Sequence, residues 1–164
     1  ANDISANTIL ELSGRKCFKK LEFTIIGDGA LYEEVTRPLE RFENVKLIQG
    51  FLTNEEYEKI FEEFGIFLTP TRWDSHGVGR DEAMSCGLVP ATNRISAIPE
   101  FVNRGCSILA EPEDHIGLAD GIEELVNNPE LFIKKSNKAA KRVRRQTSHD
   151  VTIPKEIELF IRED

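Results

Sequence analysis

The chain has 164 residues, of which 40% are hydrophobic and 30% charged, and this size and composition predict one soluble globular domain with a core of its own. A formal net charge of −8 argues against a surface that binds nucleic acid, since such surfaces are basic, but is compatible with a local site for one small anion. Three widely spaced cysteines without a CxxC pair argue against a disulfide framework and against a zinc site.

Strand-like and helix-like apolar patterns alternate over most of the chain. They predict helices over residues 4–12, 31–42, 54–64, 79–86 and 98–103, and strands over residues 21–26, 45–49, 66–69, 88–92 and 107–110. Pro38 marks a kink in the second of these helices. The strand over 66–69 is apolar enough to be buried on both faces. From residue 114 to 164 the pattern is helical only, over residues 116–127, 129–145 and 153–162.

Three helix starts carry recognisable caps. Thr53 precedes Glu56 by three residues, which predicts a capping box. Asp114 and Asn128 are predicted caps of two later helices, and Pro129 suits the first helical position after Asn128. The helix that Thr53 opens is expected to bury the stripe Tyr57, Ile60, Phe61 and Phe64.

Alternation of strands and helices predicts an α/β domain with a Rossmann-like parallel sheet and helices on both faces. Residues 1–164 are expected to form this one domain, with 114–164 as its all-helical C-terminal part. Ligands of such folds bind at the carboxyl ends of the strands. The turns to inspect are therefore those after Ile26, Gln49, Leu68 and Thr92.

The turn after the strand over 66–69 holds the densest group of functional residue types. Gly77 and Gly79 leave the backbone open to a ligand at the start of a helix, where free N–H groups attract anions. Asp74 stands before the turn and Glu82 one helical turn inside, and both are suited to accept hydrogen bonds from sugar hydroxyls. Two arginines at the same place, Arg72 and Arg80, could bind phosphate.

These residues resemble a family signature, the two acidic residues separated by seven others in family 4 retaining glycosyltransferases of the GT-B fold. Asp74 and Glu82 have that spacing, and the residues after Glu82, A-M-S-C-G, are close to the family's A-M-A-x-G. Further segments resemble the family's motifs in the same order, namely 23–29, 45–52, 97–102 and 103–114. The resemblance covers about residues 21–127 and identifies the chain as the C-terminal, donor-binding domain.

The resemblance implies a role for each matching residue. Glu82 would accept hydrogen bonds from the ribose, and Asp74 would contact hydroxyls of the transferred sugar. Backbone N–H groups near Gly77 and Val78 would hold the diphosphate or the edge of the sugar. The remaining donor contacts would come from Gly27 and Gly29, which let a loop pass close to the donor, and from Phe51 or Leu52 beside the base.

Four positions depart from the family pattern. Asp74 stands where Glu is usual, His76 where Phe is common, and Arg80 and Asp81 where apolar residues are common. The strand and the phosphate-binding loop with glycine, arginine and lysine that usually open the donor domain are not found, nor is the acceptor domain that precedes it. We therefore expect the sequence to begin partway along a longer two-domain protein.

The resemblance further implies transfer of a sugar from a nucleoside diphosphate to an acceptor hydroxyl, with retention of configuration, in cell-surface glycan or polysaccharide biosynthesis. We expect no cofactor, and metal independence because no Asp-x-Asp pair is placed to hold a divalent ion. Residues 77–79 with Arg72 or Arg80 would stabilise the departing diphosphate. The chain alone is expected to bind the donor without useful turnover, since the acceptor would bind through the other domain.

Other interpretations stay open. A GT-B sugar-nucleotide epimerase would bind the same nucleotide, and a non-catalytic nucleotide-binding module of flavodoxin type would share the fold. A dehydrogenase is disfavoured because no G-x-G-x-x-G follows a first strand. The basic run 134–145 is typical of a solvated helix face, and it also predicts contact with anionic lipid at the inner face of the membrane for a cytoplasmic enzyme.

Overall fold

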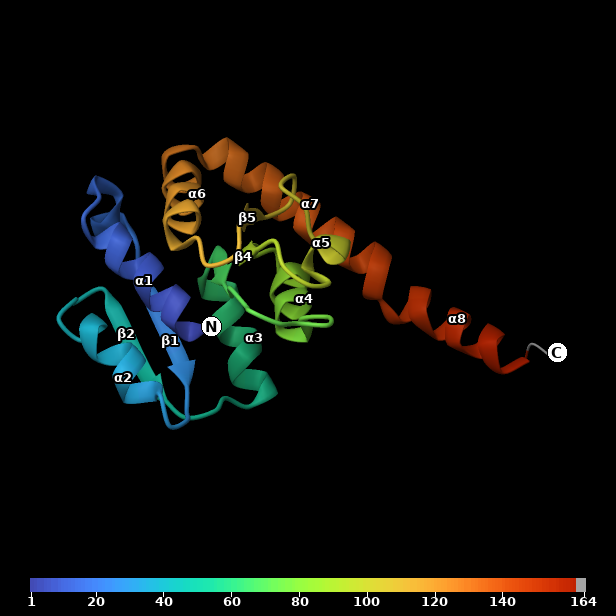
Figure 1. The fold of residues 1–164 in the computed structure, drawn as a ribbon. Helices are drawn as coiled ribbons and strands as arrows, with labels where there is room; N and C mark the ends of the chain where they lie inside the picture. Colours follow the sequence, from blue (N-terminus) through green and yellow to red (C-terminus); the bar gives the residue numbers. More distant parts are fainter. Residues whose placement is uncertain (162–164) are drawn as a thin grey trace.

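The computed structural model describes residues 1–161, an α/β fold of parallel strands flanked by helices (Figure 1). The strands are β1 (Phe23–Gly27), β2 (Val45–Gln49), β3 (Ile66–Leu68), β4 (Val89–Asn93) and β5 (Ile108–Ala110). They form two sheets, β1-β2 and β3-β4-β5, and every pairing within them is parallel. The predicted fold class is confirmed.

Apart from α2, the helices lie where the apolar patterns and caps predicted them, with shifts of up to four residues at their ends. They are α1 (Asn2–Ser13), α2 (Tyr32–Thr36), α3 (Asn54–Glu63), α4 (Val78–Ser85), α5 (Ile98–Phe101), α6 (His115–Asn127), α7 (Pro129–Thr147) and α8 (His149–Ile161), with 3-10 turns at Lys16–Lys20 and Arg37–Leu39. All three predicted caps are present. Thr53 and Glu56 form a reciprocal capping box, the Asp114 carboxylate accepts from Gly117 N–H at 2.8 Å, and the Asn128 side chain accepts from Leu131 N–H at 3.1 Å.

The helix expected over 31–42 is much shorter than predicted. Only Tyr32–Thr36 is α-helical, and the 3-10 turn Arg37–Leu39 follows at once. Pro38 has no backbone N–H and its ring crowds the preceding turn, so the chain tightens here and the helix does not continue as a kinked one.

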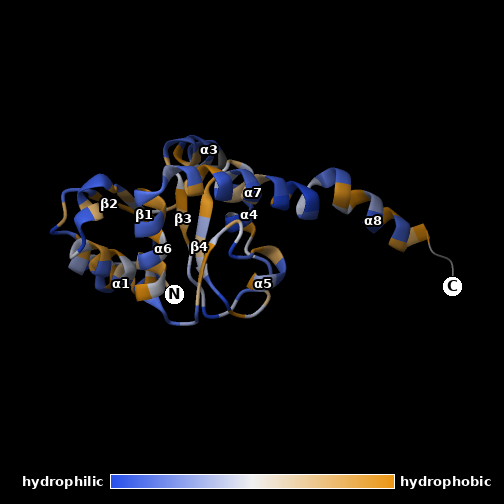
Figure 2. Ribbon diagram, turned by 90° about the horizontal axis from the view of Figure 1, so that it is seen from above, coloured by the Kyte–Doolittle hydropathy of each residue, from blue (hydrophilic) through white to orange (hydrophobic). Residues whose placement is uncertain are grey.

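Helices cover both faces of the sheet β3-β4-β5, and Figure 2 shows apolar residues along β3 and in part of β4. The alternating side chains of β5 make the division plain. Ile108 and Ala110 pack in one cluster with α1 and α6, whereas Leu109 packs in another with α4 and α7. The sheet is consequently packed on both faces, by α1 and α6 on one side and by α4 and α7 on the other.

A cavity of about 890 Å³ separates the two sheets and is lined by all of β1, by β3 and by α3. The backbone of Phe23 and Gly27 bonds toward β2, through Asn44 C=O and Gly50 N–H, each at 2.9 Å. Because backbone polar groups alternate in direction along a strand, those of Thr24 and Ile26 face the cavity. The same alternation turns the backbone of Ile66 and Leu68 toward it from β3, whose other edge pairs with β4.

The cavity overturns two burial predictions. The strand over 66–69 is half-buried, not buried on both faces, because one edge of β3 faces the cavity. In the expected stripe of α3 only Phe61 is buried, at 7% exposure. Tyr57, Ile60 and Phe64 line the cavity and remain partly accessible.

Helix α8 projects away from the sheets in both Figure 1 and Figure 2. It has no buried residue. None of the helices described within residues 1–161 combines the length and the apolar character needed to cross a bilayer. The end of the predicted helix 153–162, at Arg162, lies outside the described residues.

Candidate functional site

The predicted site lies on the loop that joins the carboxyl end of β3 to the first turn of α4. Gly77 caps this helix in a left-handed conformation, with φ 81° and ψ 59°, and no side chain caps it. A Cβ at residue 77 would stand 2.8 Å from Arg80 Nη1 and 3.0 Å from Asp74 Oδ2. Both backbone conformation and space therefore require glycine at this position.

The start of α4 leaves N–H groups free, as the first turn of a helix does. No hydrogen bond of the described residues uses the N–H of Gly77, Val78 or Gly79. Val78 and Gly79 are exposed. Together these groups offer an anion a row of uncommitted donors at the positive end of the helix dipole.

Asp74 lies beside these donors and is half-buried. Its Oδ1 accepts from the N–H of His76 at 3.0 Å, which fixes the turn between them. Asp74 also lines a cavity of about 160 Å³ together with Gly77, Arg80 and, from the strand ends, Thr69 and Thr92. The structure thus brings the predicted carboxylate, the glycine turn and one arginine to a single hollow.

Glu82 stands apart from that hollow. It is exposed on α4, and its carboxylate makes no hydrogen bond or ion pair with any residue that the structure describes. An uncommitted carboxylate one helical turn from the free donors is available to a ligand that extends along the outside of α4.

Arg72, predicted to bind phosphate, is already paired on both edges of its guanidinium group. It donates to Asp3 of α1 at 2.7 and 2.9 Å and to Glu113 at 2.8 Å. These two carboxylates raise the pKa of Arg72 above its ordinary value, and the Arg72 guanidinium in turn lowers the pKa of Asp3. The arginine joins α1 to the loop before α6, and phosphate binding by Arg72 would require it to leave these partners.

Arg80 is the more deeply placed of the two arginines, with 2% of its surface exposed. Its Nε and Nη2 donate to Asp81 Oδ1 at 3.1 and 2.9 Å. Nη2 also donates to the carbonyl of His76, whose ring Nε2 lies 3.0 Å from Asp81 Oδ2. The ring of Phe101, at the end of α5, stacks on His76 at 4.5 Å and lies 4.9 Å from the Arg80 guanidinium carbon.

This cluster accounts for three of the departures from the family pattern. His76, Arg80 and Asp81 replace commonly apolar residues, yet hydrogen bonds join Asp81 to both of the others and Arg80 to the carbonyl of His76. Sequence reasoning missed the roles of Asp81 and Phe101. The adjacent opposite charges of Arg80 and Asp81, at positions that are commonly apolar in the family, were the available signal.

The ends of β1 and β2 form a second part of the predicted site. Gly50 N–H donates to Gly27 C=O at 2.9 Å, and Asp28 Oδ1 accepts from Gly29 N–H and from the Gln49 side chain. The Gln49 amide, and after it the Gly29 backbone, lowers the pKa of Asp28. Gly27 and Gly29 line the larger cavity, and their closeness to a donor stays a prediction.

Phe51 and Leu52, predicted beside the base, follow directly after β2. Phe51 is 84% exposed and Leu52 is half-buried. Neither lines the two cavities, so their contact with a base stays a prediction. No three His, Cys, Asp or Glu side chains gather as a potential metal-ligand set within the described part of the chain.

Residues 4–128 match the family model described as Glycosyl transferases group 1. Among curated relatives, an uncharacterized 41.2 kDa protein in the cps region of Klebsiella pneumoniae is 30% identical over 74% of this chain and 32% of its own length. The amylovoran biosynthesis glycosyltransferase AmsK of Erwinia amylovora is 34% identical over 67% of this chain and 28% of its own. The chain therefore spans about a third or less of these relatives.

Among solved structures, S. aureus TarM in complex with Fondaparinux, alpha-GlcNAc-glycerol and UDP superposes with a TM-score of 0.82. The two are 20% identical, and the match covers 98% of this chain and 32% of TarM. This likeness establishes the fold.

Proposed function

The chain belongs to the family Glycosyl transferases group 1, and from this premise we propose that it is the donor-binding domain of an enzyme that transfers a sugar from a nucleoside diphosphate to an acceptor hydroxyl. Its relative AmsK is an amylovoran biosynthesis glycosyltransferase, and from this likeness we infer a glycan as the acceptor class. Membership of family 4 and placement in the C-terminal half of the enzyme are parts of the same proposal.

One observation carries the proposal, the free N–H groups of Gly77, Val78 and Gly79 flanked by two carboxylates. A diphosphate has the charge that a helix N-terminus attracts, and each hydrogen bond to a charged group contributes about 1.5–3 kcal/mol. Carboxylates repel phosphate but accept well from hydroxyls. Asp74 is suited to the hydroxyls of the transferred sugar and Glu82 to those of the ribose, on either side of the diphosphate.

In the proposed reaction the bond between the anomeric carbon and the diphosphate breaks, and negative charge grows on the departing phosphate. Preorganised N–H donors at residues 77–79 would stabilise that charge more strongly in the transition state than in the ground state. This stabilisation needs neither a cofactor nor a metal ion, and we propose transfer with retention of configuration. Product analysis distinguishes transfer from epimerisation, since an epimerase would release a free altered sugar.

Ligand-induced stabilisation of the intact protein tests the proposal. UDP, GDP, ADP and NAD are each added with and without Mg²⁺, and a ligand at 100 times its Kd adds about 2.7 kcal/mol to the free energy of unfolding. We expect one nucleoside diphosphate to stabilise the protein without metal, and Glu82→Ala to abolish the effect. Glu156→Ala on α8 is the matched control. The assigned donor site would be refuted if no diphosphate stabilised the protein, or if Glu82→Ala left the stabilisation unchanged.

We further propose that the chain works as part of a longer, two-domain protein and turns over no substrate alone. The cavity between β1 and β3 supports this, because the two parallel edges that face it leave the backbone groups of Thr24, Ile26, Ile66 and Leu68 without strand partners. The length of the relatives supports it as well. Kinetics of the isolated chain equal to those of the intact enzyme would contradict the proposal.

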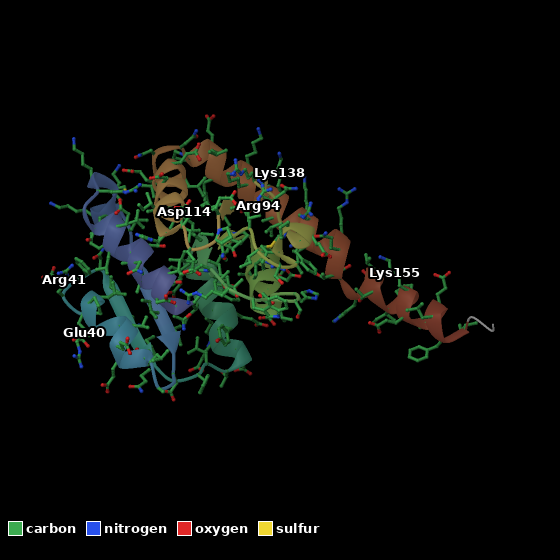
Figure 3. All side chains as sticks on the ribbon, viewed as in Figure 1. Glu40, Arg41, Arg94, Asp114, Lys138 and Lys155 are labelled. Carbon is green, nitrogen blue, oxygen red and sulfur yellow. The ribbon has the colours of Figure 1, made fainter. Side chains whose placement is uncertain are left out.

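Contact with an anionic membrane is proposed for the outer face of α7. The side of α7 that packs on the domain holds Ala139 and Val143. The opposite side exposes the basic residues Lys134, Lys138, Lys141 and Arg145, and Figure 3 labels Lys138 on this helix. Each basic residue near an anionic surface contributes about 1 kcal/mol. We expect sedimentation with phosphatidylglycerol vesicles at low salt and not with phosphatidylcholine vesicles; equal sedimentation with both would contradict this proposal.

A further inference from the structure

The peptide plane between His76 and Gly77 can face either way as far as the local sequence is concerned. Glycine adopts positive and negative φ with similar ease, so the backbone alone does not decide which way this plane faces. Within a trans peptide, the C=O of one residue and the N–H of the next point in opposite directions. Whatever group holds the His76 carbonyl therefore also sets the direction of the Gly77 N–H.

Arg80 holds that carbonyl. Its Nη2 donates to His76 C=O from inside the first turn of α4. The Gly77 N–H is thereby turned away from Arg80, and it makes no hydrogen bond with any described residue. The other guanidinium nitrogen, Nη1, is buried, has no hydrogen-bond partner among the described residues, and lies against Gly77. A positive charge thus stands directly behind the turn that carries the free donors.

The guanidinium group cannot swing aside without a large loss. Asp81 Oδ1 holds two of its nitrogens, and the Phe101 ring lies against its central carbon at 4.9 Å. Asp81 is anchored from its other oxygen by His76 Nε2. His76 is therefore attached twice, through its ring by Asp81 and through its carbonyl by Arg80.

We propose that Arg80 is a positioning residue that aims the Gly77 N–H at the diphosphate of the donor, and that Asp81 and His76 keep Arg80 in place. The inference rests on the proposed function, since it assigns the diphosphate to this turn. It differs from direct phosphate binding by arginine, because Arg80 acts through the backbone and remains buried. Loss of Arg80 should then weaken recognition of the diphosphate while leaving recognition of the base and ribose intact.

The test compares the affinity of the intact protein for UDP, GDP and ADP with its affinity for the corresponding nucleosides. For the base that is recognised, the Kd of the nucleoside is divided by the Kd of the nucleoside diphosphate. This ratio measures the contribution of the diphosphate to binding. We expect Arg80→Met to reduce this ratio by about tenfold or more, as the loss of one charge-assisted hydrogen bond would, with nucleoside affinity unchanged. Arg15→Met is the matched control, since Arg15 is similarly paired with carboxylates but lies beyond the C-terminal end of α1, before the 3-10 turn Lys16–Lys20.

A second variant separates positioning from stability. Arg80→Met/Asp81→Leu removes both charges and is expected to fold as stably as the natural protein, yet to keep the lowered ratio. A ratio within about twofold of the natural one in both variants would overturn the inference and leave the donor site standing. If the natural protein bound each nucleoside diphosphate no more tightly than the corresponding nucleoside, both the proposed function and this inference would be refuted.

Discussion

Removing the Asp81 carboxylate tests how far the charged cluster of α4 supports the fold. Asp81→Ala removes the carboxylate partner of the Arg80 guanidinium, which is 2% exposed. It also removes the hydrogen-bond partner of the His76 ring. Breaking a buried ion pair from one side costs about 3–5 kcal/mol, and we expect the lower end, about 3 kcal/mol, since the Asp81 side chain keeps 10% of its exposure. For a domain of this size, each kcal/mol lowers the melting temperature by about 2–4 °C, which predicts a fall of about 6–12 °C.

Urea and thermal denaturation of the same preparations provide the measurement. Three variants are compared with the natural chain, namely Asp81→Ala, Arg80→Met and the double variant Arg80→Met/Asp81→Leu. We expect the double variant to melt within a few degrees of the natural chain, because it leaves no unpaired charge in the interior. A double variant less stable than either single variant, or an Asp81→Ala protein that melts unchanged, would refute the reasoning.

Further stability predictions concern glycines and one ion pair. Gly77→Ala should cost about 1–2 kcal/mol from the left-handed backbone alone, with more from contact with Arg80 Nη1; unchanged denaturation would contradict this. Gly121→Ala should destabilise the fold although alanine favours helices by about 1 kcal/mol, because the new Cβ would lie 2.3 Å from Ile108 Cγ2; urea midpoints decide the sign. The Arg72 guanidinium lowers the pKa of Asp3 in the folded state. The ion pair therefore stabilises the fold above pH 3.8, the ordinary pKa of Asp3. This stabilisation is lost as the pH falls through the folded-state pKa. Asp3→Asn should flatten that part of the acid stability profile, and an unaltered profile would show that the pair contributes nothing.

Local rules predicted much of this fold because the atoms involved are close in sequence. Thr53 with Glu56, and Asp114 with Gly117, satisfy the first N–H groups of their helices from three residues away. Such contacts need no knowledge of the rest of the chain. The strand Val45–Gln49 was likewise predicted to the residue.

Contacts between distant residues were beyond that reasoning. Arg72 carries the right charge for phosphate, but its partners Asp3 and Glu113 lie 69 and 41 residues away. His76 and Arg80 stand where apolar residues are common in the family, and the Phe101 ring that contacts both comes from a later part of the chain. Sequence patterns indicated the position of the loop correctly, whereas the assignment of each charged side chain depended on which others the fold brought close.

The open edges of β1 and β3 have a practical consequence for production of the chain. Unpaired strand edges act as templates on which other chains add strands, which is a common start of aggregation. Here two such edges face each other across one cavity, and a strand entering from another molecule could pair with both. The isolated chain should therefore self-associate as its concentration rises, and charged substitutions placed along these edges should improve its solubility.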